Sequence, residues 1–220
     1  MIGERGARKS TVQESNRSPL PRGHRTLIIA CGALSHEIVH LIRVNNWSHL
    51  DLTCIPAKIH HTPGKIPDAV RKKIHQSRPD YGRIFVMFGD CGTGGLLDKM
   101  LEEEGVERIA GPHCFSFLSS NSQFEEWTRD EITSFYLSDF FCWNFDRIVW
   151  EGLGLDRRDD LAEFVFANYK KVVYMAQTEN ESLQEKAREI AHRLNLEYEY
   201  RFVGYGDLES GMRQIPVSIA

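Results

Sequence analysis

The stretch that decides the fold is RIFVMFGDCGTGGLLDKML, residues 83–101. It begins with a short apolar run, passes through Gly89-Asp90-Cys91-Gly92 and Thr93-Gly94-Gly95, and continues with helical periodicity. An apolar strand, a glycine-rich turn and an amphipathic helix form the first half of a β-α-β unit. In open α/β sheets, ligands bind beyond the carboxyl ends of the strands. The turn therefore places a carboxyl group and a thiol where such folds carry their chemistry.

Two other predicted strands also run towards a cysteine. Residues 27–30 lead into Cys31, and residues 106–110 lead into Cys114. Three thiolates from neighbouring strand ends can hold a metal and leave one position open, as a catalytic zinc or a substrate-binding iron-sulfur cluster requires. We therefore predict Cys31, Cys91 and Cys114 as metal ligands. Their spacing matches no local finger or ferredoxin motif, so zinc and iron-sulfur both stay open.

The composition restricts the classes of function. The 220 residues are 41% hydrophobic and 26% charged, which is ordinary for a globular protein, and the formal net charge is −4. The chain lacks the basic excess of a nucleic-acid-binding protein, and no apolar run approaches the ~18 residues of a membrane span. The start of the chain has no apolar signal core, so we expect a cytoplasmic protein. Five cysteines in such a chain favour thiols or metal ligands over disulfides.

Strands and helices alternate along the chain, which predicts an α/β fold with a doubly wound, mainly parallel sheet. We expect a disordered extension over residues 1–24 and a single domain over residues 25–220. The first and last parts echo each other weakly, which leaves open two β-α-β lobes, residues 25–120 and 160–212. Residues 121–159 are rich in aromatics, and we expect them to form a helical connector that covers the sheet.

Three side chains near the cysteines are candidates for moving a proton. Asp90 and His113 stand next to a cysteine, and Glu37 lies in the first turn of the helix that follows Cys31. Each also has a structural explanation: Asp90 can cap the next helix, His113 can be a surface histidine, and Glu37 can favour the helix dipole.

Other residues are candidates for cofactor binding. Gly92 and Gly94 allow the backbone to approach a ligand closely. His60 lies in a loop rich in proline and glycine, and it can either reach the same site or remain solvated. Cys54 and Cys142 stand in apolar surroundings and are predicted to be structural.

One motif points elsewhere. The pentapeptide His36-Glu37-Ile38-Val39-His40 matches the H-E-x-x-H pattern of zinc proteases. Here it opens the helix after the first strand of a parallel sheet, and no third-ligand motif follows. The context favours a chance match.

Seven motifs together resemble a large bacterial and archaeal family designated a domain of unknown function. They are Ala30-Cys31-Gly32, His60 to Pro63, Gly89 to Gly95, Gly111 to Phe115, Tyr136 to Phe140, Tyr174 to Gln177 and Gly204 to Asp207. The resemblance adds Gln177 and Tyr205 to the candidate cofactor-binding residues. Members are often encoded near corrinoid-dependent methyltransferases, which implies one-carbon or methylamine metabolism and a corrinoid protein or methyltransferase as partner.

The sequence thus favours a cytoplasmic metalloenzyme that acts on a small molecule through a three-cysteine zinc or iron-sulfur site. Two alternatives stay open. One is a non-catalytic accessory protein that carries a metal, cluster or corrinoid for a methyltransferase. The other is a metal-free thiol enzyme with Cys91 as nucleophile.

Overall fold

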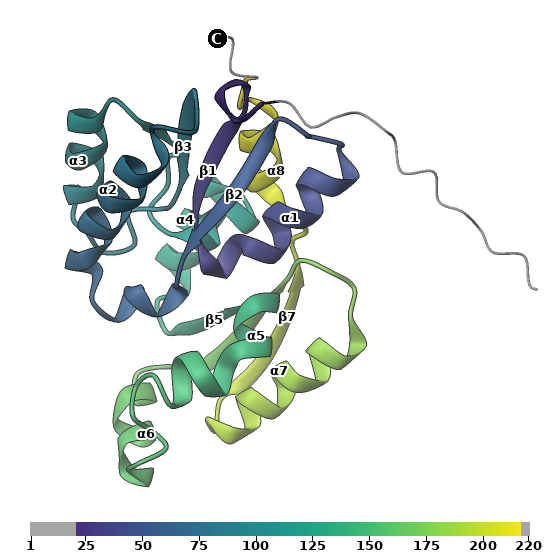
Figure 1. Ribbon diagram of the computed structural model, residues 1–220. Helices are drawn as coiled ribbons and strands as arrows, with labels where there is room; N and C mark the ends of the chain where they lie inside the picture. The colour runs from purple at the N-terminus through teal and green to yellow at the C-terminus, as the bar shows by residue number, and fades with distance from the viewer. Residues whose placement is uncertain (1–20, 217–220) are drawn as a thin grey trace, which may run out of the picture.

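The computed structural model describes residues 21–216 and contains two parallel β-sheets with helices packed around them (Figure 1). The first sheet has the strand order β2-β1-β3-β4, and the second has the order β5-β6-β7. The strands are β1 (Thr26–Cys31), β2 (Leu50–Ile55), β3 (Arg83–Met87), β4 (Glu107–Arg108), β5 (Ser134–Ser138), β6 (Lys171–Ala176) and β7 (Glu197–Phe202). The predicted α/β class with parallel strands is confirmed.

Residues 21–216 also contain eight α-helices, of which α8 follows the last strand. They are α1 (Ser35–Val44), α2 (Ile66–Ser77), α3 (Leu96–Glu104), α4 (Asn121–Asp130), α5 (Asp139–Phe145), α6 (Asp159–Phe166), α7 (Glu181–Arg193) and α8 (Gly206–Arg213). None of the helices in residues 21–216 combines the length and apolarity that a membrane crossing requires.

The first sheet has helices on both faces. All six residues of β1 are buried, as expected for a central strand of a parallel sheet. Helices α2 and α3 pack together on one side, and α1 lies on the other (Figure 1). The apolar faces of α1 and α2 supply Ile38 and Ile74 to the core of this sheet, both fully buried.

The second sheet has its own core. Its central strand β6 is buried after the first residue, and Tyr174 is its largest fully buried side chain. Helix α7 packs on β6 and β7 and also contacts α5. In Figure 1 this sheet lies below the first, and α8 then carries the chain back to the first sheet. Leu208 and Met212 of α8 are buried in the core of the first sheet, so helix α8 forms part of that core.

The connector differs from the expectation. We predicted a helical connector over residues 121–159, but Ser134–Ser138 forms β5 between α4 and α5. The strand pairs with β6 along its whole length, from Ser134 opposite Lys171 to Ser138 opposite Met175. Phe135 and Tyr136 suit a pleated, half-buried surface, and the pairing overrides the apparent helical spacing of the aromatics.

Smaller differences concern boundaries. The residues before α1 form a 3₁₀ turn (Gly32–Leu34), and Leu34 takes the N-cap position of α1. The expected loop after β2 contains two 3₁₀ turns, Ala57–His61 and Pro63–Lys65. Of the expected extension, Arg22–His24 forms a 3₁₀ turn, and residues 1–20 lie outside the described residues.

Candidate metal centre between the sheets

The cysteines lie at the topological switch point of the first sheet. From β1 the chain crosses to β2 on one side, whereas β3 lies on the other side of β1. The crevice beyond the carboxyl ends of β1 and β3 is therefore where a doubly wound sheet binds its ligands. Cys31 is the last residue of β1, and Cys91 lies in the turn that follows β3. Cys114 begins a 3₁₀ turn, Cys114–Leu118, that follows β4.

The turn after β3 has an unusual backbone. Cys91 has φ of 49°, in the left-handed region that residues with a side chain rarely adopt. Two hydrogen bonds hold it there, because the backbone N–H groups of Asp90 and Cys91 donate to the carbonyl oxygens of Gly111 and Pro112 at 2.9 and 2.8 Å. These bonds tie the turn to the segment that carries Cys114.

Gly89 permits this close approach. A Cβ atom at Gly89 would lie 2.6 Å from the carbonyl carbon of His113 and 2.9 Å from the backbone nitrogen of Cys114. Arg108 fixes the same region from outside: its guanidinium donates to the carbonyl oxygens of Phe88, Ile109 and Gly111 and to the carboxylate of Asp98. The backbone positions of Cys91 and Cys114 are thus strongly determined.

The side chains converge as well. The Sγ atoms of Cys91 and Cys114 are 3.5 Å apart. Cys31, His60 and Cys114 each offer a ligand atom, and these three atoms lie within 4.8 Å of one another. The thiols of Cys31, Cys91 and Cys114 are buried, and none of the five cysteines forms a disulfide. The Cys31-His60-Cys114 group can hold a metal ion.

His60 has the orientation of a metal ligand. Its Nδ1 lies 2.7 Å from the carbonyl oxygen of Ala57, and its ring stacks on Phe88 with centroids 5.9 Å apart. A histidine that binds a metal through one ring nitrogen usually donates the other N–H to such a carbonyl. Burial lowers the pKa of His60, but the interactions with Cys91 and with the Ala57 carbonyl outweigh this and raise it.

The surroundings of Cys91 and Cys114 favour the protonated thiol over the thiolate. The hydrogen bond to Cys114 and burial raise the pKa of Cys91 to about 12. The hydrogen bond to Cys31 and burial raise the pKa of Cys114 well above its ordinary value. A metal ion reverses this preference because it stabilises the thiolates directly.

A cavity of about 500 Å³ adjoins the thiols. His60, Cys91, His113 and Cys114 form its polar part. The rest is mostly apolar and aromatic, from both halves of the molecule: Ala33, Leu34, Phe115, Leu118, Phe135, Ser138, Phe141 and Tyr169. The volume lies within the range of small-molecule sites.

Asp90 points into its own turn. Its carboxylate accepts hydrogen bonds from the Thr93 hydroxyl at 2.5 Å and from the backbone N–H groups of Gly94 and Gly95 at 3.1 and 2.8 Å. Burial tends to raise the pKa of Asp90, but these hydrogen bonds lower it. These hydrogen bonds order the turn before α3, whereas the Leu97 N–H in the first turn of α3 donates to the Thr93 hydroxyl oxygen at 3.4 Å, so Asp90 supports the turn and does not cap the helix directly. Gly94, with φ of 63° and open space around it, serves the turn by its backbone conformation, and Gly92 lies against Pro63.

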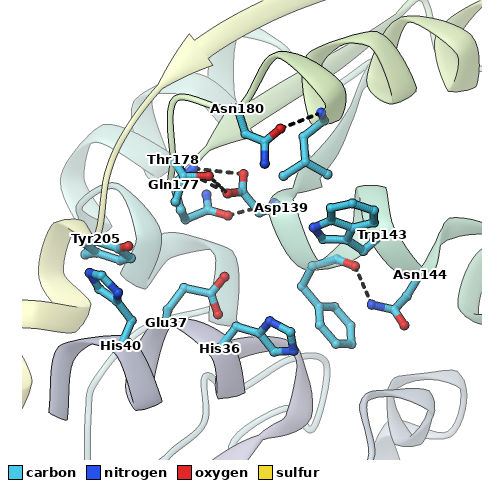
Figure 2. Close-up of a pocket in the computed structure, with 12 residues that line it drawn as sticks. His36, Glu37, His40, Asp139, Trp143, Asn144, Gln177, Thr178, Asn180 and Tyr205 are labelled. Atoms are coloured by element: carbon cyan, nitrogen blue, oxygen red, sulfur yellow. Dashed lines mark hydrogen bonds between the residues drawn. The ribbon is translucent and has the colours of Figure 1, made fainter. Parts of the chain in front are cut away.

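Three sequence candidates lie in a second pocket, drawn in Figure 2. Glu37, Gln177 and Tyr205 line a cavity of about 230 Å³ between α1 and the carboxyl ends of the second sheet. The rings of His36 and His40 point away from each other there, with Glu37 between them (Figure 2). Within the part of the chain that the structure describes, neither histidine belongs to a group able to hold a metal. The structure therefore adds no support to the zinc-protease interpretation of the H-E-x-x-H pattern.

The chain was also compared with known proteins. A family model described as "Protein of unknown function (DUF1638)" matches residues 54–212, which is well over half of the chain. The chain belongs to the DUF1638 family. Searches of curated proteins and of solved structures found no match.

The DUF1638 match covers Cys91, Cys114 and His60, whereas Cys31 precedes it. Sequence reasoning missed the role of Asp139, which is buried at the junction of β5 and α5 and lines the second pocket. Recognising the strand before it would have revealed this residue as a carboxylate at a strand end.

Proposed function

We propose that this DUF1638 protein binds a single metal ion, zinc, through Cys31, Cys114 and His60, with Cys91 at or beside the fourth position. The observation that carries the proposal is the convergence of the Cys31, His60 and Cys114 ligand atoms within 4.8 Å. Cysteine and histidine together are typical zinc ligands. The stacked, carbonyl-bound ring of His60 supports its assignment.

The sulfur spacing favours a single ion over a cubane cluster. Two thiolates on one tetrahedral zinc lie roughly 3.7 Å apart when the Zn–S bonds are near 2.3 Å. The Sγ atoms of Cys91 and Cys114 are separated by 3.5 Å, close to this value. In a cubane cluster each thiolate binds a different iron, which requires wider spacing.

The adjoining cavity supports an enzymatic role on a small molecule. Zinc supplies a Lewis acid that activates a bound thiol or water at neutral pH. His113 lines the cavity beside Cys91 and is the side chain we propose to carry the proton. Asp90 is engaged in its turn and Glu37 lines the other pocket, so neither takes this role in our proposal. The aromatic wall would exclude water and select an apolar substrate group.

Two other roles receive less support. A metal-free thiol enzyme needs a thiolate, whereas burial and the Cys114 hydrogen bond raise the pKa of Cys91 to about 12. An accessory role for a corrinoid methyltransferase, and a place in one-carbon metabolism, rest on the family resemblance alone. A cofactor-transfer assay with a purified corrinoid protein would test that role.

The decisive experiment is purification without oxygen, followed by elemental analysis and an optical spectrum. We expect about one zinc per chain and, after exchange with cobalt, a thiolate-to-cobalt absorption band. Cys114→Ser should abolish stoichiometric metal. Cys54→Ser is the matched control, because Cys54 is half-buried in β2 and is not a member of the candidate metal-binding group. A metal-free wild-type protein, or equal metal in both variants, would contradict the proposal.

A further inference from the structure

The second pocket is built by both halves of the molecule. Helix α1 contributes one wall, and the residues that follow β5, β6 and β7 contribute the others, including Asp139, Gln177 and Tyr205. At about 230 Å³ the cavity is smaller than a typical drug-sized site, so it suits a small ligand. The metal centre does not use it.

Glu37 leaves a buried acceptor in this pocket. Its side chain is 5% exposed, and its Oε2 atom is buried without a hydrogen-bond partner among the described residues. The carboxyl group points from α1 towards Asp139 and Gln177 (Figure 2). A buried carboxyl oxygen without a donor is costly, so the position calls for a donor from a ligand.

Asp139 cannot provide that donor and adds negative charge. Its carboxylate accepts hydrogen bonds from the Tyr174 hydroxyl at 2.7 Å, from the backbone N–H groups of Gln177 and Thr178, and from the Thr178 hydroxyl. These donors are neutral, so the charge of Asp139 has no cationic partner among them. Burial, with a further contribution from Asp139, raises the pKa of Glu37 to about 7.

The remaining lining is aromatic and amide-rich. Phe140, Trp143 and Tyr205 line the pocket, and the Tyr205 ring stacks on His40 with centroids 5.3 Å apart. None of the lining residues in the described chain is a lysine or an arginine. Lys186 lies over the Trp143 ring at 5.9 Å and Arg147 donates to Asn144, but neither side chain lines the pocket. Aromatic faces beside carboxylates attract organic cations.

We propose that this pocket binds a small molecule through a primary or secondary ammonium group, which donates an N–H to Oε2 of Glu37. The unpaired acceptor distinguishes this ligand from a quaternary ammonium, which has no N–H to donate. The negative charges of Glu37 and Asp139 distinguish it from a carboxylate or a phosphate. This pocket is separate from the cysteine centre, so the proposal of an ammonium site does not depend on a metal ion at the cysteines.

The test compares three probes of similar size and different charge. Propylammonium, propan-1-ol and propionate are titrated into the full chain and followed by ligand-observed NMR and calorimetry. We expect saturable binding of propylammonium and at least ten-fold weaker binding of the other two, about the effect of a charge-assisted hydrogen bond. Preference for propan-1-ol or propionate, or no saturable propylammonium binding up to about 100 mM, would overturn the proposal.

A matched pair of variants locates the site. Glu37→Gln keeps the side-chain shape and removes the charge, and we expect it to weaken propylammonium roughly 10-fold to 100-fold. Glu102→Gln removes an exposed charge from α3 and should leave binding unchanged. Equal binding by both variants would overturn the assignment. If Glu37→Gln fails to fold, the probe preference of the wild-type protein still decides the matter.

Binding should also depend on pH. The cation needs ionised Glu37, so affinity should fall as the pH drops from about 8 to about 6, through the raised pKa of this group. The other titratable groups that line the pocket are His36 and His40 on α1, together with Asp139 and Tyr205, which follow strands of the second sheet. The Glu37→Gln variant separates these contributions, because the fall caused by Glu37 must disappear in it. An identical pH profile in wild type and variant would contradict the role of Glu37.

Discussion

Substitution of Gly89 by alanine tests how the fold brings Cys91 and Cys114 together. The added Cβ would meet the backbone of His113 at 2.6 and 2.8 Å and that of Cys114 at 2.9 Å. Real Cβ contacts are longer, so one of the two backbone segments must move. The φ of Gly89 lies outside the left-handed region, so the conflict is steric alone.

We expect Gly89→Ala to lower the free energy of unfolding by about 1–3 kcal/mol, the usual cost of overpacking a rigid interior. The same shift should displace Cys114 relative to Cys91 and weaken metal binding about 10-fold to 100-fold, like other changes that misplace a ligand. Urea denaturation of the metal-free protein measures the first effect, and competition with a chelator measures the second.

Gly94→Ala is the control for this prediction. Gly94 has φ of 63° and open space around it, so alanine there strains the backbone by about 1 kcal/mol without touching the cysteines. It should lower stability and leave metal affinity unchanged. If Gly89→Ala binds metal as tightly as the wild-type protein, the close approach does not position the ligands and our reasoning is refuted.

Substitutions at three further positions, with a control at His61, test the site and its surroundings. His60→Ala should lower metal affinity strongly, whereas His61→Ala should not, and chelator competition compares the two. Cys142→Ser should cost about 1–3 kcal/mol, because it buries a hydroxyl in the fully enclosed core of the second sheet, yet metal content should stay unchanged by elemental analysis. Asp90→Asn keeps an acceptor oxygen but loses the charge, so it should lower the melting temperature less than Asp90→Ala, which also removes the hydrogen bonds that order the turn before α3, worth about 1 kcal/mol. Because the folded state lowers the pKa of Asp90, the charge-dependent part of its contribution is present at neutral pH and is lost as the pH falls below about 4. The stability difference between the wild-type protein and Asp90→Ala should therefore shrink at acid pH, and a constant difference would contradict this origin.

The sequence predicted the parts of the fold that local patterns encode. The apolar run before Gly89 and the glycines after it are sufficient to place Cys91 at a strand end, and the same logic places Cys31. The sequence pattern could not show that His60 lies close to the cysteines. That position depends on how the 3₁₀ turn after β2 packs against Phe88, which follows β3.

The connector shows why some of the architecture was missed. Ser134–Ser138 has few residues and no clear alternation, and only its pairing with β6 makes it a strand. If β5 is not recognised, only two strands are left for the second sheet. Asp139 is then no longer identified as a carboxylate at the end of a strand. The packing of α8 on the first sheet is likewise a long-range event, seen in the Thr26 hydroxyl that donates to the carbonyl oxygen of Pro216.

The most direct test of the metal centre is X-ray absorption spectroscopy at the metal edge of protein purified without oxygen. We predict one ion surrounded by sulfur atoms near 2.3 Å and one nitrogen near 2.0–2.1 Å, with the nitrogen signal lost in His60→Ala. A first shell of oxygen and nitrogen alone, or a metal–metal distance of a cluster, would contradict a single ion held by Cys31, Cys114 and His60.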